Sequence, residues 1–173
     1  GDPGFLNDST DHRSLEFLRK TDDKIYLVDQ KIEDPAYGDG WSWDDFPYDF
    51  MPEKSLFPVY GNTIKVSKGR DSLTVRPSFF SNMVKMVDQP ETARDPDDNI
   101  FYVKKSDLFL NRRIPFKTSN QLVADLLGQE LGAKVTLVSN KEFYVFKPFK
   151  REAYDSLLTK MLVNSDNFIA EQL

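Results

Sequence analysis

The sequence predicts an α+β fold, with a mixed, mostly antiparallel β middle and flanking helices. Two observations predict it. Apolar residues recur at helical spacing near both ends of the chain, whereas the middle holds short runs of β-branched and aromatic residues separated by Gly, Pro and Asp. With 173 residues, the chain is long enough to bury a core without disulfides or metals.

A helix followed by a strand is expected first. The helix is predicted from about Asp11 to Lys20, capped by Ser9 or Thr10, with Leu15 on its apolar face. The apolar run at residues 25–28 then predicts a buried strand. Together they form the opening unit of the chain.

The middle of the chain is predicted to be β-rich. Residues 34–58 are dense in Pro, Gly, Asp and aromatics, which indicates an irregular loop. A hairpin is expected around Gly61-Asn62, joining residues 56–60 to residues 63–67. An exposed loop is expected over residues 89–99, and further strands over residues 73–76, 83–87 and 100–103.

The second half is predicted to alternate helices and strands. After a strand ending near Phe116, Ser119 is expected to cap a helix that runs to Leu131 and stops at Gly132. Strands are expected over residues 135–138 and 143–146. A last helix is expected from about Arg151, with one apolar face formed by Tyr154, Leu157, Leu158, Met161 and Leu162.

Composition excludes several classes of function. The 23 basic and 28 acidic residues give a formal charge of −5, and the basic residues are scattered, so no nucleic-acid partner is expected. No cysteine is present and His12 is the only histidine, so neither a zinc site nor a cysteine nucleophile is expected. No metal or other cofactor is predicted, and His12 is expected on the surface. No apolar run approaches ~18 residues, so no membrane span is expected.

An acidic, aromatic loop, "YGDGWSWDDFPYDF", allows several interpretations. Four carboxylates surround two indoles, namely Asp39, Asp44, Asp45 and Asp49 around Trp41 and Trp43. Neither the regular oxygen spacing of a calcium loop nor a facing pair of glycosidase carboxylates is visible. The main expectation is a loop pinned by buried indoles, with Trp41 or Trp43 largely out of solvent. Exposed aromatics that stack sugar rings are the remaining interpretation.

The chain contains part of a serine-acyltransfer signature. That signature consists of Ser-x-x-Lys, then Ser-x-Asn, then Lys-Thr-Gly. No serine here is followed by Lys at the third position, and Lys117-Thr118-Ser119 comes before the Ser-x-Asn, so we interpret it as a strand end and a helix cap. Ser165-Asp166-Asn167 therefore matches the second motif alone.

The surroundings of this motif carry a family resemblance. "LLTKMLVNSDNFIAEQL" resembles the second-motif region of the D-alanyl-D-alanine carboxypeptidase/endopeptidase family, the class C penicillin-binding proteins. The resemblance extends over almost the whole chain, through "GDPGF", "IYLVD", "YGDGWSWDDFPYDFMPEKSLFPVYGNTIKV" and "QLVADLLGQELGAKV". Two positions depart from the family pattern, because Asp39 stands where Pro is common and Met51-Pro52 where Ala-Pro is common.

The resemblance implies a domain division and an activity. Residues 1–150 would be the accessory region inserted into the carboxypeptidase, and residues 151–173 the start of the penicillin-binding catalytic domain. The parent enzyme would acylate its serine on the D-Ala-D-Ala carbonyl of peptidoglycan stem peptides and would bind β-lactams. Ser165 would relay or hold a proton, Asn167 would orient the substrate, and Asp166 would be structural.

The chain is therefore expected to be a fragment that is inactive alone, because it lacks the nucleophile and Lys-Thr-Gly motifs. The resemblance also implies a periplasmic or other extracytoplasmic location. The last helix would have to cover its apolar face, either against the β-rich middle or by self-association through a second copy. The alternative function is a non-catalytic cell-wall or carbohydrate-binding module, stacking sugars through Trp41 and Trp43.

Overall fold

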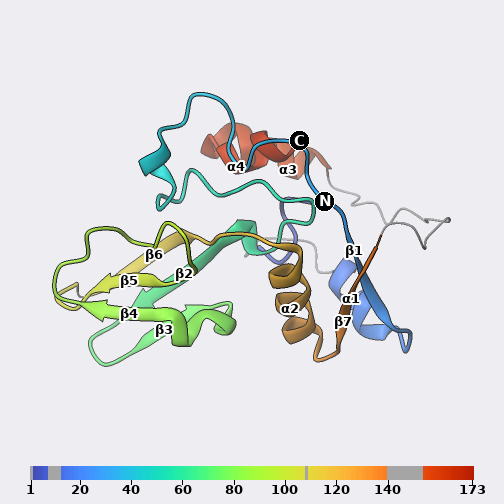
Figure 1. Ribbon diagram of the computed structural model, residues 1–173, viewed down its shortest axis with the longest axis horizontal. Coiled ribbons are helices and arrows are strands. Elements are labelled where there is room, and N and C mark those ends of the chain that lie inside the picture. Colours follow the sequence, from blue (N-terminus) through green and yellow to red (C-terminus); the bar gives the residue numbers. More distant parts are fainter. Residues whose placement is uncertain (1, 8–12, 108, 140–153) are drawn as a thin grey trace. The chain divides into compact units, whose positions relative to one another are not determined.

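The structure, a computed structural model, describes residues 2–7, 13–107, 109–139 and 154–173. It confirms the predicted α+β class (Figure 1). Within those ranges there are three small sheets: a three-stranded antiparallel sheet in the order β3-β2-β6, and two parallel pairs, β1-β7 and β4-β5. Four predictions fall outside the described residues: the cap at Ser9 or Thr10, the surface position of His12, the strand at residues 143–146 and the helix start near Arg151.

The chain forms two compact units, and both are discontinuous in sequence. Unit 1 comprises Gly1–Pro35, Lys54–Gly61 and Thr118–Leu173, and unit 2 comprises Ala36–Glu53 and Asn62–Lys117. The predicted boundary between residues 150 and 151 falls in a segment outside the described residues. Each unit is described by itself below.

Unit 1 is built around helix α2 (Asn120–Leu131) and the parallel strands β1 (Ile25–Asp29) and β7 (Val135–Ser139). The predicted ends of α2 are confirmed: Ser119 Oγ accepts a hydrogen bond from the Leu122 amide, and Gly132 ends the helix in the left-handed conformation, at φ 64°. The prediction of a buried first strand is wrong, since Tyr26 is 45% exposed. Both strands contact α2.

Unit 1 also contains three further helices among its described residues. Helix α1 (Arg13–Lys20) buries Leu15 and contacts α2, and Arg19 pairs with Glu130 at 2.8 Å. Helices α3 (Tyr154–Asn164) and α4 (Asn167–Gln172) contact each other. On the predicted apolar face of α3, Leu157 is buried, whereas Leu162 is 73% exposed in the single chain.

Unit 2 contains the antiparallel sheet formed by β2 (Thr63–Lys68), β3 (Leu73–Arg76) and β6 (Leu110–Pro115). The predicted strand at residues 73–76 is confirmed. A 3-10 helix, η3 (Ser78–Met83), supplies Phe80, whose ring centroid lies 5.6 Å from that of Phe101 and 5.2 Å from that of Phe116. All three phenylalanines are fully buried and form the aromatic centre of the unit's core.

The remaining strands of unit 2, β4 (Val84–Val87) and β5 (Phe101–Lys104), lie where the sequence predicts strands, but they pair in parallel. Parallel neighbours need a crossover of about a dozen residues, and residues 88–100 form that connection. The segment was predicted to be an exposed loop. That prediction is wrong for Ala93 and Arg94, both of which are buried.

The predicted hairpin around Gly61-Asn62 is also wrong. Residues 56–59 form no strand, and Tyr60–Asn62 form the short helical turn η2, with φ between 51° and 62° at all three residues. The backbone groups that a hairpin would pair across the turn bond elsewhere: the Tyr60 amide donates to the Phe5 carbonyl, and the Asn62 carbonyl accepts from the Phe116 amide. Strand β2 pairs with β3 and β6 instead.

No helix in the described part of the chain is both long enough and apolar enough to cross a membrane.

Candidate functional site

The Ser-Asp-Asn motif forms the joint between α3 and α4. Ser165 follows the last residue of α3 and is exposed, with φ at 51°, in the left-handed region. The amide of the next residue, Asp166, donates a 2.9 Å hydrogen bond back to the Met161 carbonyl. This six-to-one bond with a left-handed residue inside it is a Schellman C-cap, in which the position of Ser165 is usually glycine. Ser165 therefore occupies a backbone conformation that costs a side-chain-bearing residue about 1–2 kcal/mol.

Asp166 begins the next helix. Its Oδ1 accepts a 3.0 Å hydrogen bond from the Ile169 amide, so the residue is the N-cap of α4. This confirms the prediction that the middle residue of the motif is structural. Asn167 is the first residue of α4 and is half-buried. Within the described part of the chain, no hydrogen bond is formed by the Ser165 hydroxyl or by the Asn167 side chain.

The acidic, aromatic loop is ordered by a different set of rings from the one predicted. Of the two indoles, one of which was predicted to be largely out of solvent, Trp43 is 83% exposed and Trp41 is half-buried. Trp41 packs on Phe50 with ring centroids 5.7 Å apart, and Phe50 stacks on Tyr48 at 5.5 Å with an interplanar angle of 4°. These three rings hold the loop and leave the indole of Trp43 in solvent.

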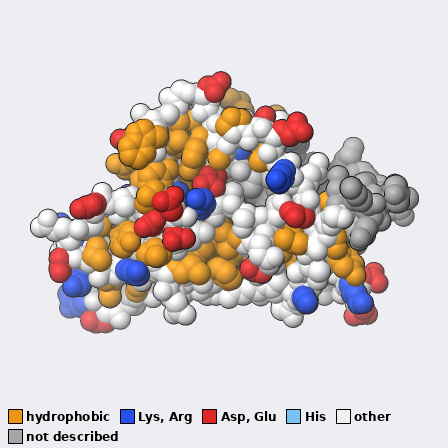
Figure 2. All heavy atoms as spheres, in the orientation of Figure 1, with side chains coloured by type: hydrophobic (Ala, Val, Ile, Leu, Met, Phe, Trp, Pro, Cys, Tyr) orange, Lys and Arg blue, Asp and Glu red, His pale blue; other side chains and the backbone are white. Residues whose placement is uncertain are grey.

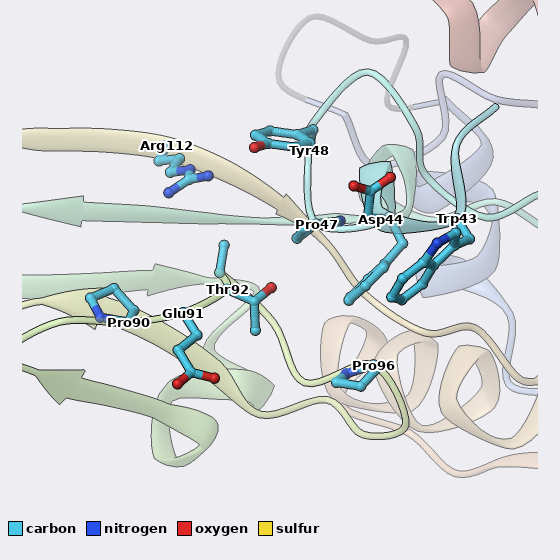
Figure 3. A pocket seen from close by; sticks show the side chains of 11 residues that line it. Trp43, Asp44, Pro47, Tyr48, Pro90, Glu91, Thr92, Pro96 and Arg112 are labelled. Atoms are coloured by element: carbon cyan, nitrogen blue, oxygen red, sulfur yellow. The ribbon is translucent and has the colours of Figure 1, made fainter.

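A pocket of about 520 Å³ lies beside this loop, within unit 2 (Figure 3). Figure 3 shows Trp43, Asp44, Pro47 and Tyr48 on one side of the pocket and Pro90, Glu91, Thr92 and Pro96 on the other, with Arg112 at one end. Phe46 and Ala93 complete the lining. In Figure 2, hydrophobic side chains gather over the segment that carries this loop, with acidic and basic side chains beside them.

A buried polar cluster supports the pocket from within unit 2. The Arg94 guanidinium lies 4.8 Å from the centre of the Phe46 ring and donates to the Asp95 carbonyl. The hydroxyl of Tyr37 donates to Glu53 Oε1 at 3.3 Å. Burial, reinforced by the negative charge of Glu53, raises the pKa of Tyr37 to about 12. Tyr37 is therefore neutral at ordinary pH.

The four carboxylates of the loop do not assemble into a metal site. Asp44 lines the pocket, whereas Asp39, Asp45 and Asp49 do not. Among the residues that the structure describes, no group of three or more His, Cys, Asp or Glu side chains is placed to hold a metal ion.

Sequence reasoning missed the residues that face Trp43 across the pocket. Glu91 and Thr92 belong to the crossover between β4 and β5, and Arg112 to β6, all more than 45 positions away in the sequence. Pro90 and Pro96 indicated that the crossover is a loop. No local pattern indicated that this loop lies near Trp43. Glu91 and Thr92 lie near Trp43 because the crossover that carries them joins the parallel strands β4 and β5.

A comparison of the chain with protein-family models finds no match. A comparison with curated proteins finds no match either.

Proposed function

We propose that this chain is part of a serine-type D-Ala-D-Ala carboxypeptidase/endopeptidase that acts on peptidoglycan stem peptides. Because the sequence contains no Ser-x-x-Lys, the proposal requires the nucleophile to lie in another part of the parent protein. The chain by itself is then inactive. The parent works in the periplasm or in another extracytoplasmic space, where its substrate is found.

The observation that carries the proposal is the left-handed conformation of Ser165. Glycine would fill this helix C-cap without strain, so a serine there points to a use for its hydroxyl. Asp166 supports the same interpretation, because its side chain caps α4 and is not available to a substrate. The cap leaves Ser165 and Asn167, the two residues named by the Ser-x-Asn pattern, on either side of it.

The proposed chemistry is acyl transfer. The parent's nucleophilic serine attacks the carbonyl carbon of the penultimate D-Ala, the bond to the terminal D-Ala nitrogen breaks, and that nitrogen takes up a proton. Ser165 relays or holds a proton near the leaving group. Asn167 donates an amide hydrogen bond that orients the reacting peptide. Water then hydrolyses the acyl-enzyme and restores the serine.

The test uses the parent protein and a fluorescent penicillin. We expect a covalent label on a serine outside residues 1–173, and D-Ala release from a D-Ala-D-Ala peptide. Ser165→Ala should slow acylation by about a hundredfold or more, which is typical of a lost acid–base group. Thr159→Ala, on an exposed position of α3, is the matched control and should leave the rate unchanged.

Two results would overturn the proposal. One is a parent protein that takes no label, and the other is a label whose rate is the same with and without Ser165. The isolated chain provides a third check, because intact-mass analysis should show no penicillin adduct on it. A stoichiometric adduct on a serine of this chain would mean that the missing motifs are not needed.

Self-association through the C-terminal helix is part of the same proposal. Leu162 and Val163 of α3 are 73% and 76% exposed, which leaves an apolar surface. Sedimentation of the isolated chain over a range of concentrations tests it. A dimer that dissociates on Leu162→Lys would support it, and a monomer at every concentration would contradict it.

A further inference from the structure

The floor of the pocket beside Trp43 is formed by packed side chains. Pro47 and Ala93 are buried in it, and Phe46 is held by the Arg94 guanidinium. The Thr92 hydroxyl donates to the Arg94 carbonyl at 3.0 Å, which ties the opposite wall to the same buried arginine. A pocket whose walls are fixed before a ligand arrives loses little conformational entropy on binding.

The rim of the pocket presents an unusual apolar surface. Trp43 is the first residue of the 3-10 helix η1 (Trp43–Asp45). The Asp45 amide donates a hydrogen bond to the Ser42 carbonyl, and in the following turn the Tyr48 amide donates to the Asp45 carbonyl. Tyr48 is also exposed and lines the same pocket. Scattered exposed apolar residues need no explanation, but an exposed indole and an exposed phenol that line the same hollow give it an aromatic rim.

The polar groups of the pocket carry both signs of charge. Asp44 and Glu91 offer acceptors and Arg112 offers donors, and none of the three pairs with another side chain in the described ranges. A simple anion would be repelled by the carboxylates, and a simple cation by the guanidinium. A neutral ligand rich in hydroxyl groups can donate hydrogen bonds to Asp44 and Glu91 and accept them from Arg112.

A pyranose ring combines these properties. One of its faces presents C–H groups that pack on the π-face of an aromatic ring, and its edge carries hydroxyls. We propose that this pocket binds a sugar ring of a glycan, with Trp43 as the stacking platform and Asp44, Glu91 and Arg112 bonding its hydroxyls. The inference goes beyond the acyl-transfer function and does not depend on it, because every residue that it uses lies in unit 2.

The ligand extends over more than one ring. A second hollow of about 390 Å³ shares Pro90, Glu91, Thr92 and Pro96 with the first and continues to Tyr102. The shared residues join the two hollows along the crossover between β4 and β5. An oligosaccharide laid across them would contact an aromatic residue in each hollow, so tetrasaccharides should bind more tightly than the corresponding monosaccharides.

The experiment is a calorimetric titration of the chain with two probes, the tetramer of β-1,4-linked N-acetylglucosamine and cellotetraose. We expect at least one of them to bind. Trp43→Ala should weaken that binding by about tenfold to a hundredfold, the range found when one stacking platform is lost. Because Trp43 is exposed, the variant should keep the melting temperature of the wild type.

Control variants separate this site from other surfaces. Phe109→Ala removes another exposed aromatic of unit 2, outside the pocket, and should leave binding unchanged. Ser165→Ala should also leave it unchanged, so failure here is distinguishable from failure of the proposed acyl transfer. Trp43→Phe should retain part of the affinity.

Three results would overturn the inference. The first is no binding of either oligosaccharide at millimolar concentration. The second is equal binding by wild type and Trp43→Ala. The third is binding of a sugar-free stem peptide at Trp43 in preference to both oligosaccharides, which would assign the pocket to a peptide.

Discussion

The guanidinium of Arg94 lies 4.8 Å from the centre of the Phe46 ring, and it is buried, with 1% of its surface exposed. It also donates to the Asp95 carbonyl, while its Nε has no hydrogen-bond partner among the described residues. The contact joins the crossover between β4 and β5 to the aromatic loop. Arg94→Ala should lower the free energy of unfolding by about 2–4 kcal/mol, because it removes a desolvated cation–π contact and leaves a cavity.

Urea unfolding measures this effect. Arg112→Ala is the matched control, because that arginine is exposed and should change stability by less than about 0.5 kcal/mol. Equal effects of the two substitutions would contradict a structural role for Arg94.

A second prediction concerns the Tyr60 hydroxyl, which donates a 2.8 Å hydrogen bond to Glu130 Oε2. Tyr60→Phe should cost about 1 kcal/mol of unfolding free energy, since the partly buried carboxylate loses one donor and keeps Arg19. Tyr48→Phe, whose hydroxyl bonds to no described residue, is the control and should be neutral. If Tyr60→Phe leaves the free energy of unfolding unchanged, water replaces the phenol as the donor to Glu130.

The third prediction follows from the raised pKa of Tyr37, about 12 in the folded protein. Its ordinary pKa is about 10, so the folded state holds the proton more tightly than the unfolded state does. The resulting contribution to stability is fully present below pH ~10 and is lost as the pH rises toward ~12. Unfolding experiments from pH 9 to 11.5 should show wild-type stability falling more steeply than that of Tyr37→Phe. Parallel curves would contradict the prediction.

A fourth prediction tests the strain at Ser165. Ser165→Gly should keep or raise the free energy of unfolding, by up to about 1 kcal/mol, because glycine adopts φ of 51° without a steric penalty. Thr159→Gly, in the interior of the same helix, should lower it. If both glycines destabilise α3 to the same extent, Ser165 is not strained. In the parent enzyme, Ser165→Gly should lose activity although the fold gains stability.

The fifth prediction concerns the cap of α4. Asp166→Ala should cost about 1 kcal/mol, because the Ile169 amide loses its acceptor, whereas Asp166→Asn should cost much less. Thermal unfolding of the two variants measures the difference. Identical losses would mean that the charge of Asp166, and not its hydrogen bond, stabilises the joint.

The features predictable from the sequence are those decided by neighbouring residues. Ser119 and Gly132 marked the ends of α2 correctly, because capping depends on the residues at the helix ends. The strands at residues 25–28, 73–76 and 135–138 were predicted from short runs that contain β-branched or aromatic residues. The structural role of Asp166 was expected from the family resemblance, and the cap of α4 agrees with it.

The errors arose where distant segments decide the outcome. Gly61-Asn62 has the composition of a hairpin turn. However, the amide of the preceding Tyr60 donates to the Phe5 carbonyl, and the Asn62 carbonyl accepts from the Phe116 amide. Trp43 is 83% exposed, whereas Phe50, seven positions further along, packs on Trp41. Arg94 belongs to a polar loop by its sequence, whereas in the fold its guanidinium lies against the ring of Phe46, a contact that no local pattern predicts. No local pattern contains these partners.

The interleaving of the two units also orders events on the ribosome. Every residue of unit 2 has been synthesised once Lys117 is added, so this unit can close while the rest of the chain is still being made. Unit 1 cannot, because β1 pairs with β7 in the register Ile25 to Val135, and its first strand must wait for a partner made much later. During that interval β1 lacks the strand with which it pairs, so unit 1 is completed only after unit 2.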